Sequence, residues 1–273
     1  MQRNEISMTV QEKAKWIRKL QTCKQLYVPF SMATRLPFVI CDPESFNDQA
    51  HLFVDKEQVV AFVKPYLEEK YVISGMEIAV AQRLSFLINL ISIGVNTIVF
   101  HDQDGTCAEL ELTEVIQLKE NKNLPENQRP LINPQLQLSA IYFMQAIRRP
   151  DVDLEDPKIK ELEEEASANA VRAQYLMPVE VLEEEGEDGK KKAKGIKFPY
   201  LQNKENNMVQ PIFTDGTELK KFVREQKMQI LKVAFADLVK YTTKDSYGFA
   251  INPLGINMLI RKEQIPAMVK RFE

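Results

Sequence analysis

The chain has 273 residues, with 36 basic and 39 acidic side chains and a net charge of −3. This charge is too small to favour nucleic acid or an anionic membrane surface as a partner. The sequence holds nine glycines and neither a GxGxxG nor a GxxxxGK[ST] motif, which argues against glycine-rich phosphate loops. We therefore predict no nucleotide cofactor.

Membrane and disulfide architectures are not predicted either. The most apolar run, residues 84–100, is broken by polar residues and falls short of the about 20 apolar residues that a spanning helix needs. The first ten residues lack the apolar core of a signal peptide. Cys23, Cys41 and Cys107 form no CxxC pair, which argues against a disulfide framework and a thiolate zinc site. These features predict a reduced, cytoplasmic protein.

The first predicted element is an amphipathic helix after Thr9. Thr9 and Glu12 have the spacing of a capping box, and apolar residues follow at intervals of three and four. Residues 76–80 alternate apolar and other side chains, as in a strand with one buried face. Thr97–His101 and residues 106–112 form a predicted hairpin.

The elements follow the order helix, three strands, helix, strand, helix, two strands. This mixed order predicts an α+β fold, in which a mixed β-sheet carries helices mainly on one face.

One further helix is predicted over residues 134–149, with Asn133 as N-cap and Pro134 at the first helical position. It is apolar over more than one stripe, which is typical of a helix buried between layers. We expect it to lie between the two halves of the chain or to complete one sheet. Docking into the groove of a partner is the alternative.

The second half of the chain repeats the first. The motif F-x-D-x6-F begins at Phe53 and again at Phe213, 160 residues later. Two further pairs of segments align at shifts of 149 and 155: residues 25–29 with 174–178, and residues 76–80 with 231–235. The sequence therefore predicts two tandem α+β units with a linker helix between them. Their predicted bounds are residues 1–118, a linker over 119–157, and residues 158–273.

The second unit contains 11 extra residues, which fall within residues 183–195. Their sequence, EEEGEDGKKKAKG, offers no apolar face to bury, so we predict a solvated loop.

Three segments of the second unit share a recognisable pattern: MPV at 177–179, QPIFTD at 210–215 and INPLGIN at 251–257. In these segments the unit resembles the SseB-type N-terminal domain of the enhanced serine sensitivity protein family. The first unit keeps residues 27–29 and 52–55 of the pattern but departs at residues 101–105. The resemblance implies a bacterial intracellular protein with an α+β fold, and it implies no defined activity.

The polar residues at motif positions have structural interpretations. Asp55 and Asp215 each follow a strand and precede a helix, so we predict that both are helix N-caps. In the second unit, Pro253 would preset φ and Gly255 would accept a positive φ. The predicted turn residues are Gly105, Asn252, Pro253 and Gly255.

His51 and His101 are the only histidines, and neither has the spacing of a zinc ligand. His101 lies near Asp102 and Asp104, so acid–base chemistry or a weak cation site is conceivable there. A hairpin turn explains both aspartates without such chemistry. We predict no catalytic, cofactor-binding or metal-binding residue.

Together these features predict a non-catalytic bacterial protein that binds another protein or serves as a scaffold. One alternative is an enzyme or small-ligand sensor with a pocket between the units. Another is an immunity or antitoxin-type protein. A pocket with polar groups from one unit only would favour specialised chemistry, and an apolar groove would favour a peptide.

Overall fold

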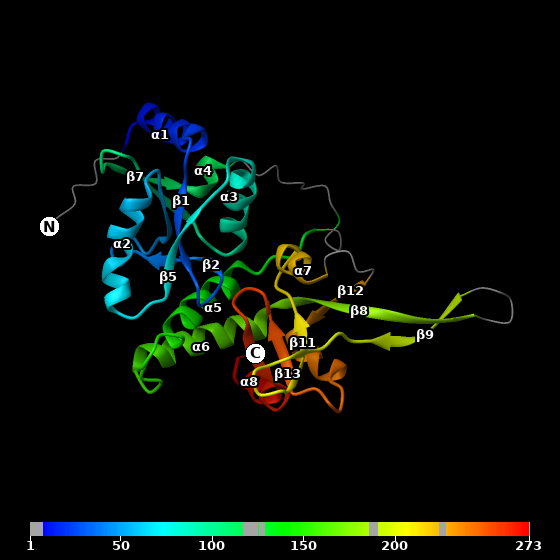
Figure 1. Cartoon of the computed structure of the whole chain (residues 1–273). Coiled ribbons are helices and arrows are strands. Elements are labelled where there is room, and N and C mark those ends of the chain that lie inside the picture. The colour runs from blue at the N-terminus through cyan, green and yellow to red at the C-terminus, as the bar shows by residue number, and fades with distance from the viewer. Residues whose placement is uncertain (1–7, 117–124, 126–128, 186–190, 224–227, 273) are drawn as a thin grey trace. The chain divides into compact units, whose positions relative to one another are not determined.

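The computed structural model describes residues 8–116, 125, 129–185, 191–223 and 228–272 (Figure 1). The chain divides into two compact units. Unit 1 comprises Met1–Met32 and Pro37–Asn121, and unit 2 comprises Ala33–Leu36 and Lys122–Glu273. Helices and sheets occur in both, so the predicted α+β fold is confirmed. None of the helices in the described ranges is long and apolar enough to cross a membrane.

Unit 1 is built on a seven-stranded sheet. Its helices are α1 (Val10–Thr22), α2 (Lys56–Glu68), α3 (Arg83–Ser92) and α4 (Leu112–Val115). Its strands are β1 (Tyr27–Ser31), β2 (Leu36–Pro37), β3 (Val39–Cys41), β4 (Asp48–Phe53), β5 (Ile73–Glu77), β6 (Thr97–His101) and β7 (Cys107–Glu111). The strand order is β2-β1-β4-β6-β7, with β3 paired to β4 and β5 paired to β1. β4 and β6 run parallel.

The start of α1 shows how local sequence determines this unit. The Thr9 N–H donates to Glu12 Oε2 at 2.9 Å, and the Glu12 N–H donates to Thr9 Oγ1 at 3.3 Å. This reciprocal pair confirms the predicted capping box. One turn later the Trp16 ring packs edge-on against Phe100 of β6, with the ring centroids 6.0 Å apart.

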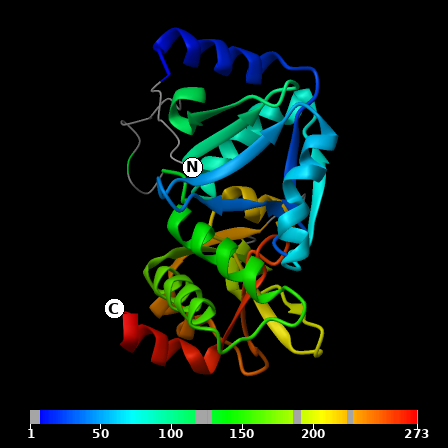
Figure 2. The same ribbon diagram turned by 90° about the vertical axis from the view of Figure 1, so that its left-hand side faces the viewer.

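Unit 2 contains two smaller sheets. Its helices are α5 (Pro134–Ile147), α6 (Pro157–Arg172), α7 (Gly216–Val223) and α8 (Ile265–Phe272), with a 3₁₀ helix η3 (Phe235–Tyr241). Its strands are β8 (Gln174–Glu185), β9 (Lys191–Lys197), β10 (Leu201–Gln202), β11 (Met208–Ile212), β12 (Gln229–Ala234), β13 (Gly248–Ile251) and β14 (Met258–Arg261). The strand orders are β10-β11-β13-β14 and β12-β8-β9. α5 lies beside α6, and α6 lies beside α8 (Figure 2).

The loop prediction for residues 183–195 is wrong over its described residues. β8 continues to Glu185 and β9 begins at Lys191, and the two strands form a hairpin that projects from unit 2 (Figure 1). Residues 186–190 lie outside the described residues. The register pairs position 184 with 192 and position 185 with 191.

Corresponding strands of the two units pair in the same way. The parallel pair β4–β6 of unit 1 corresponds to the parallel pair β11–β13 of unit 2. Tyr27 faces Phe53 in unit 1, and Leu176 faces Phe213 in unit 2, at the offsets of 149 and 160 found in the sequence. The next helix differs, because unit 1 has α3 where unit 2 has the 3₁₀ helix η3. α5 clusters with unit 2, and the described residues of unit 1 contain no corresponding helix.

Candidate functional site

In each unit, an aspartate follows the first strand of the parallel pair. Asp55 follows β4 after one residue, and Asp215 follows β11 after two. Loops at the carboxyl ends of parallel strands are frequent sites of ligand binding in proteins with such sheets. The carboxyl ends of the parallel strands are therefore the candidate binding site in each unit.

In unit 2 this end is closed by a buried polar cluster around Asp215, whose exposed fraction is 3%. Asp215 Oδ1 accepts the backbone N–H groups of Thr217 at 2.7 Å and Glu218 at 3.0 Å, at the start of α7. Asp215 Oδ2 accepts the Thr214 hydroxyl at 2.8 Å and Gln137 Nε2 at 2.8 Å. The carboxylate thus joins the first turn of α7 to helix α5.

Asn252 completes this cluster from the end of β13. Its Oδ1 accepts the Thr214 N–H at 3.0 Å, and its Nδ2 donates to Thr214 Oγ1 at 2.7 Å and to Gln137 Oε1 at 3.2 Å. Asn252 is fully buried and has a φ of 46°, which asparagine tolerates better than most residues. Asp215 and Asn252 therefore bind the nitrogen and the oxygen of the Gln137 side-chain amide.

Two residues that precede Gln137 in the chain, Leu131 and Asn133, also contact this end of the strands in unit 2. Asn133 Nδ2 donates to the backbone carbonyl oxygens of Gln174 at 2.9 Å and Thr214 at 2.6 Å. Leu131 packs against the apolar cluster formed by Leu176, Phe213 and Leu219. The chain's own segment, residues 131–137, fills the carboxyl end of the parallel strands in unit 2.

The role predicted for Gly255 needs correction. Positive φ values in this turn belong to Asn252 and Asn257, at 46° and 48°, and not to Gly255. A Cβ atom at position 255 would lie 2.7 Å from Glu218 Oε2, so a larger residue here requires the Glu218 carboxylate to shift. Burial raises the pKa of Glu218, although Lys221 Nζ, 2.5 Å from Oε1, acts in the opposite direction.

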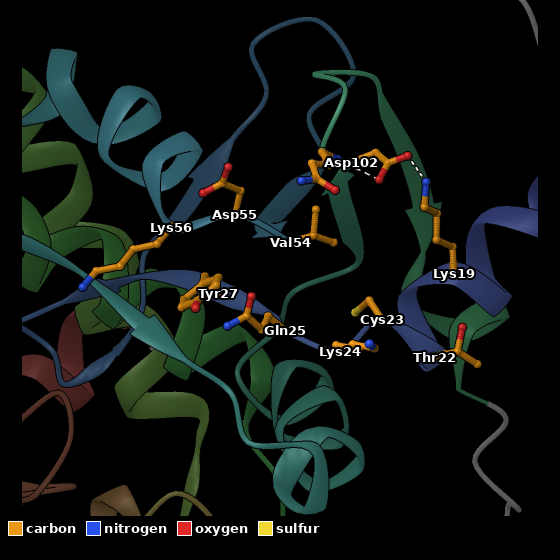
Figure 3. Close-up of a pocket in the computed structure, with 11 residues that line it drawn as sticks. Lys19, Thr22, Cys23, Lys24, Gln25, Tyr27, Val54, Asp55, Lys56 and Asp102 are labelled. Atoms are coloured by element: carbon orange, nitrogen blue, oxygen red, sulfur yellow. Dashed lines mark hydrogen bonds and ion pairs between the residues drawn. The ribbon is translucent and has the colours of Figure 1, made fainter.

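In unit 1 the equivalent end is open. A cavity of about 550 Å³ lies there (Figure 3). Its lining includes Lys19, Cys23, Gln25, Val54, Asp55 and Asp102. We call this cavity the unit 1 pocket.

Polar groups from several elements meet around the unit 1 pocket. Lys19 of α1 forms an ion pair with Asp102 at the end of β6, drawn as a dashed line in Figure 3. Asp55 begins α2, and its Oδ1 accepts the Glu57 N–H at 2.8 Å. Asp55 is half-buried, whereas Asp215 is almost fully buried. Burial raises the pKa of the Cys23 thiol, which disfavours the reactive thiolate.

The two histidines of unit 1, on β4 and β6, contact each other. His51 Nδ1 lies 2.9 Å from His101 Nε2, and the His101 ring stacks on Phe53 with centroids 4.2 Å apart. Burial lowers the pKa of His101 to about 4, so its imidazole is neutral at neutral pH.

His101, Asp102 and Asp104, for which acid–base chemistry was conceivable, each contact other residues. Asp102 pairs with Lys19, and Asp104 accepts the Thr106 hydroxyl at 2.6 Å within the hairpin turn, where Gly105 has a φ of 84°. His101 instead contacts His51. Among the residues that the structure describes, no three His, Cys, Asp or Glu side chains are grouped so as to hold a metal ion.

Sequence reasoning missed Lys19 and Gln137. Lys19 contacts a residue 83 positions away, and Gln137 contacts one 78 positions away. Neither lies in a repeated motif, so no spacing signal could identify them.

With this geometry established, comparison with known proteins identifies part of unit 2. Residues 158–267 match the SseB protein N-terminal domain. This confirms the predicted resemblance over residues 158–267. The match begins after α5 ends, so the docked segment 131–137 lies outside the SseB domain itself.

Two solved structures also align along most of the chain. Tic22 from Plasmodium falciparum is 15% identical, with 94% of this chain and 96% of that chain covered and a TM-score of 0.21. Anabaena Tic22 (protein transport) is 9% identical, with 87% and 89% covered and a TM-score of 0.21. TM-scores this low do not establish a common fold. None of the curated proteins matches this chain.

Proposed function

We propose that this protein is a non-catalytic binding protein that recognises a segment of another protein at the unit 1 pocket. One observation carries the proposal. In unit 2 the equivalent position is occupied by a polypeptide, residues 131–137 of the same chain.

The equivalence is residue by residue. In unit 2 the docked segment binds the carbonyl oxygens of Gln174 and Thr214 and the carboxylate of Asp215. Gln25, Val54 and Asp55 occupy the same places relative to the facing pairs Tyr27–Phe53 and Leu176–Phe213. All three line the unit 1 pocket. This agreement supports the two units as copies of one module, with the peptide site filled in one copy and free in the other.

The chemistry of the unit 1 pocket supports binding more than catalysis. Its cationic Lys19 is paired with Asp102, and Asp55 caps α2. The burial that raises the pKa of Cys23 disfavours its thiolate, the form in which cysteine is a nucleophile. We further propose a bacterial cytoplasmic location, which rests on the resemblance of unit 2 to the SseB family.

Affinity capture from native lysate tests this proposal with three baits. These are the wild-type protein, the pocket variant Lys19→Ala/Asp55→Ala, and the control variant Lys160→Ala. Lys160 forms an exposed ion pair with Glu155 on unit 2, at 3.0 Å. We expect a protein that wild type and control retain and that the pocket variant loses. Equal retention by all three baits would contradict the proposal.

Binding of a small molecule is the second candidate function. A volume of about 550 Å³ falls in the range of small-ligand sites, and every residue that lines the unit 1 pocket comes from one unit. Mass spectrometry of compounds released when the purified protein is denatured distinguishes the two candidates. A compound released by wild type and absent from the pocket variant would favour the small ligand.

A further inference from the structure

We propose that the unit 1 pocket receives the first turn of a helix in the partner, with asparagine at the N-cap and a hydrogen-bond donor four residues later. This inference rests on the proposed function and names the chemistry of the segment that is recognised.

In unit 2, the side chain of Asn133 binds the unit and does not cap its own helix. Asparagine at an N-cap ordinarily accepts a hydrogen bond from the first turn of its own helix. Asn133 makes no such bond to α5. Its side-chain amide instead donates to the two carbonyl oxygens of Gln174 and Thr214. Asn133 therefore serves to dock the helix onto the unit.

The residues that accept this docking turn have counterparts in the lining of the unit 1 pocket, namely Gln25, Val54 and Asp55. Two of the three accepting groups in unit 2 are backbone carbonyl oxygens, those of Gln174 and Thr214, and they do not depend on side-chain identity. The third is the carboxylate of Asp215, and Asp55 supplies the same group in unit 1. Because Asn133 and Gln137 are separated by four residues, one helical turn presents both donors on the same side.

Two replacements in unit 1 define the ligand further. Val54 stands in the place of Thr214, and His101 stands in the place of Asn252, whose Nδ2 donates to Gln137 Oε1. His101 directs its Nε2 to His51. The Asp55 carboxylate thus provides an acceptor without the neighbouring amide donor. The partner residue four positions after the asparagine must therefore supply a hydrogen-bond donor to the Asp55 carboxylate.

A partner segment must also be able to reach the unit 1 pocket. Asp55 is half-buried, whereas Asp215 is 3% exposed with α5 in place. Lys56, next to Asp55 at the start of α2, is exposed. The unit 1 pocket is therefore open to a segment from outside.

Protection of Cys23 from alkylation tests this inference. Cys41 and Cys107 are exposed, so Cys41→Ser and Cys107→Ser leave Cys23 as the single thiol of the full chain. The probe is a synthetic peptide that copies residues 129–142. At millimolar peptide we expect the alkylation rate of Cys23 to fall at least threefold and to saturate. Removal of two hydrogen bonds by Asn133→Ala in the peptide should raise the half-saturating concentration about tenfold or more.

The outcomes separate this inference from the proposed function. Equal protection by the two peptides, or no protection by either, overturns the asparagine-capped turn. If lysate capture still depends on Lys19 and Asp55 in that case, the proposed function stands and only its ligand class is wrong. If Asp55→Ala in the protein leaves peptide protection unchanged, the placement of the turn in the unit 1 pocket is wrong.

Discussion

Truncation of the two capping aspartates should have very different consequences in the two units. Asp215→Ala removes the cap of α7, worth about 1 kcal/mol. It also leaves the buried Gln137 Nε2 donor without this acceptor, which costs about 1–3 kcal/mol. The expected loss is about 2–4 kcal/mol. Asp55→Ala removes the cap of α2 at a half-buried position, with an expected loss of about 0.5–1 kcal/mol.

Urea denaturation of the full chain measures this difference. Far-UV circular dichroism follows the helices of both units, and Trp16, the only tryptophan, follows unit 1. With a slope of about 2 kcal/mol/M, a loss of 3 kcal/mol lowers the midpoint by about 1.5 M. Asp215→Asn is the matched control, because it keeps an oxygen for the α7 N–H groups and should lose less. Equal shifts for Asp215→Ala and Asp55→Ala would refute the claim that segment 131–137 is docked through Asp215.

Three further perturbations follow from particular contacts. Gly255→Ala would place a Cβ atom 2.7 Å from the Glu218 carboxylate and should cost about 1–3 kcal/mol in thermal unfolding; an unchanged Tm would contradict the close approach. Since the pKa of folded His101 is lowered to about 4 from 6.5, the unfolded chain binds a proton in this window that the folded chain does not. The free energy of unfolding should therefore fall by about 1–2 kcal/mol, after allowance for solvent screening, as pH drops from 6.5 to 4. If the same pH dependence persists in His101→Phe, another group causes it. Lys19→Met should change the Trp16 fluorescence, because Nζ lies 5.7 Å from the ring centroid, with a stability loss of at most about 1 kcal/mol; an unchanged spectrum would argue against this contact.

Part of the strand framework was accessible from sequence because it depends on local signals. The Asp104-Gly105 turn predicted the hairpin of β6 and β7, which the structure confirms to within one residue at each end. The strand predicted over residues 76–80 overlaps β5 at two residues only. The sequence offsets of 149 and 160 relate the facing pair Tyr27–Phe53 of unit 1 to the facing pair Leu176–Phe213 of unit 2.

Features that depend on contacts between distant residues were not accessible in this way. Segment 183–195 has a loop-like composition, yet its described residues pair as two strands of a hairpin. In the sequence Gln137 is one polar residue on an apolar helix, yet its side chain forms hydrogen bonds with Asp215 and Asn252. The unit 1 pocket was equally hidden, because its lining comes from several elements that no single residue pattern connects.

The most direct test of the central claim compares two thiols of unit 1 in the complex with a captured partner. Cys23 lines the unit 1 pocket, and Cys107 on β7 is exposed and does not line it. If the partner inserts a segment into the pocket, the alkylation rate of Cys23 should fall at least threefold while that of Cys107 stays the same. An unchanged rate at Cys23, or protection of Cys107 instead, would contradict recognition at this site.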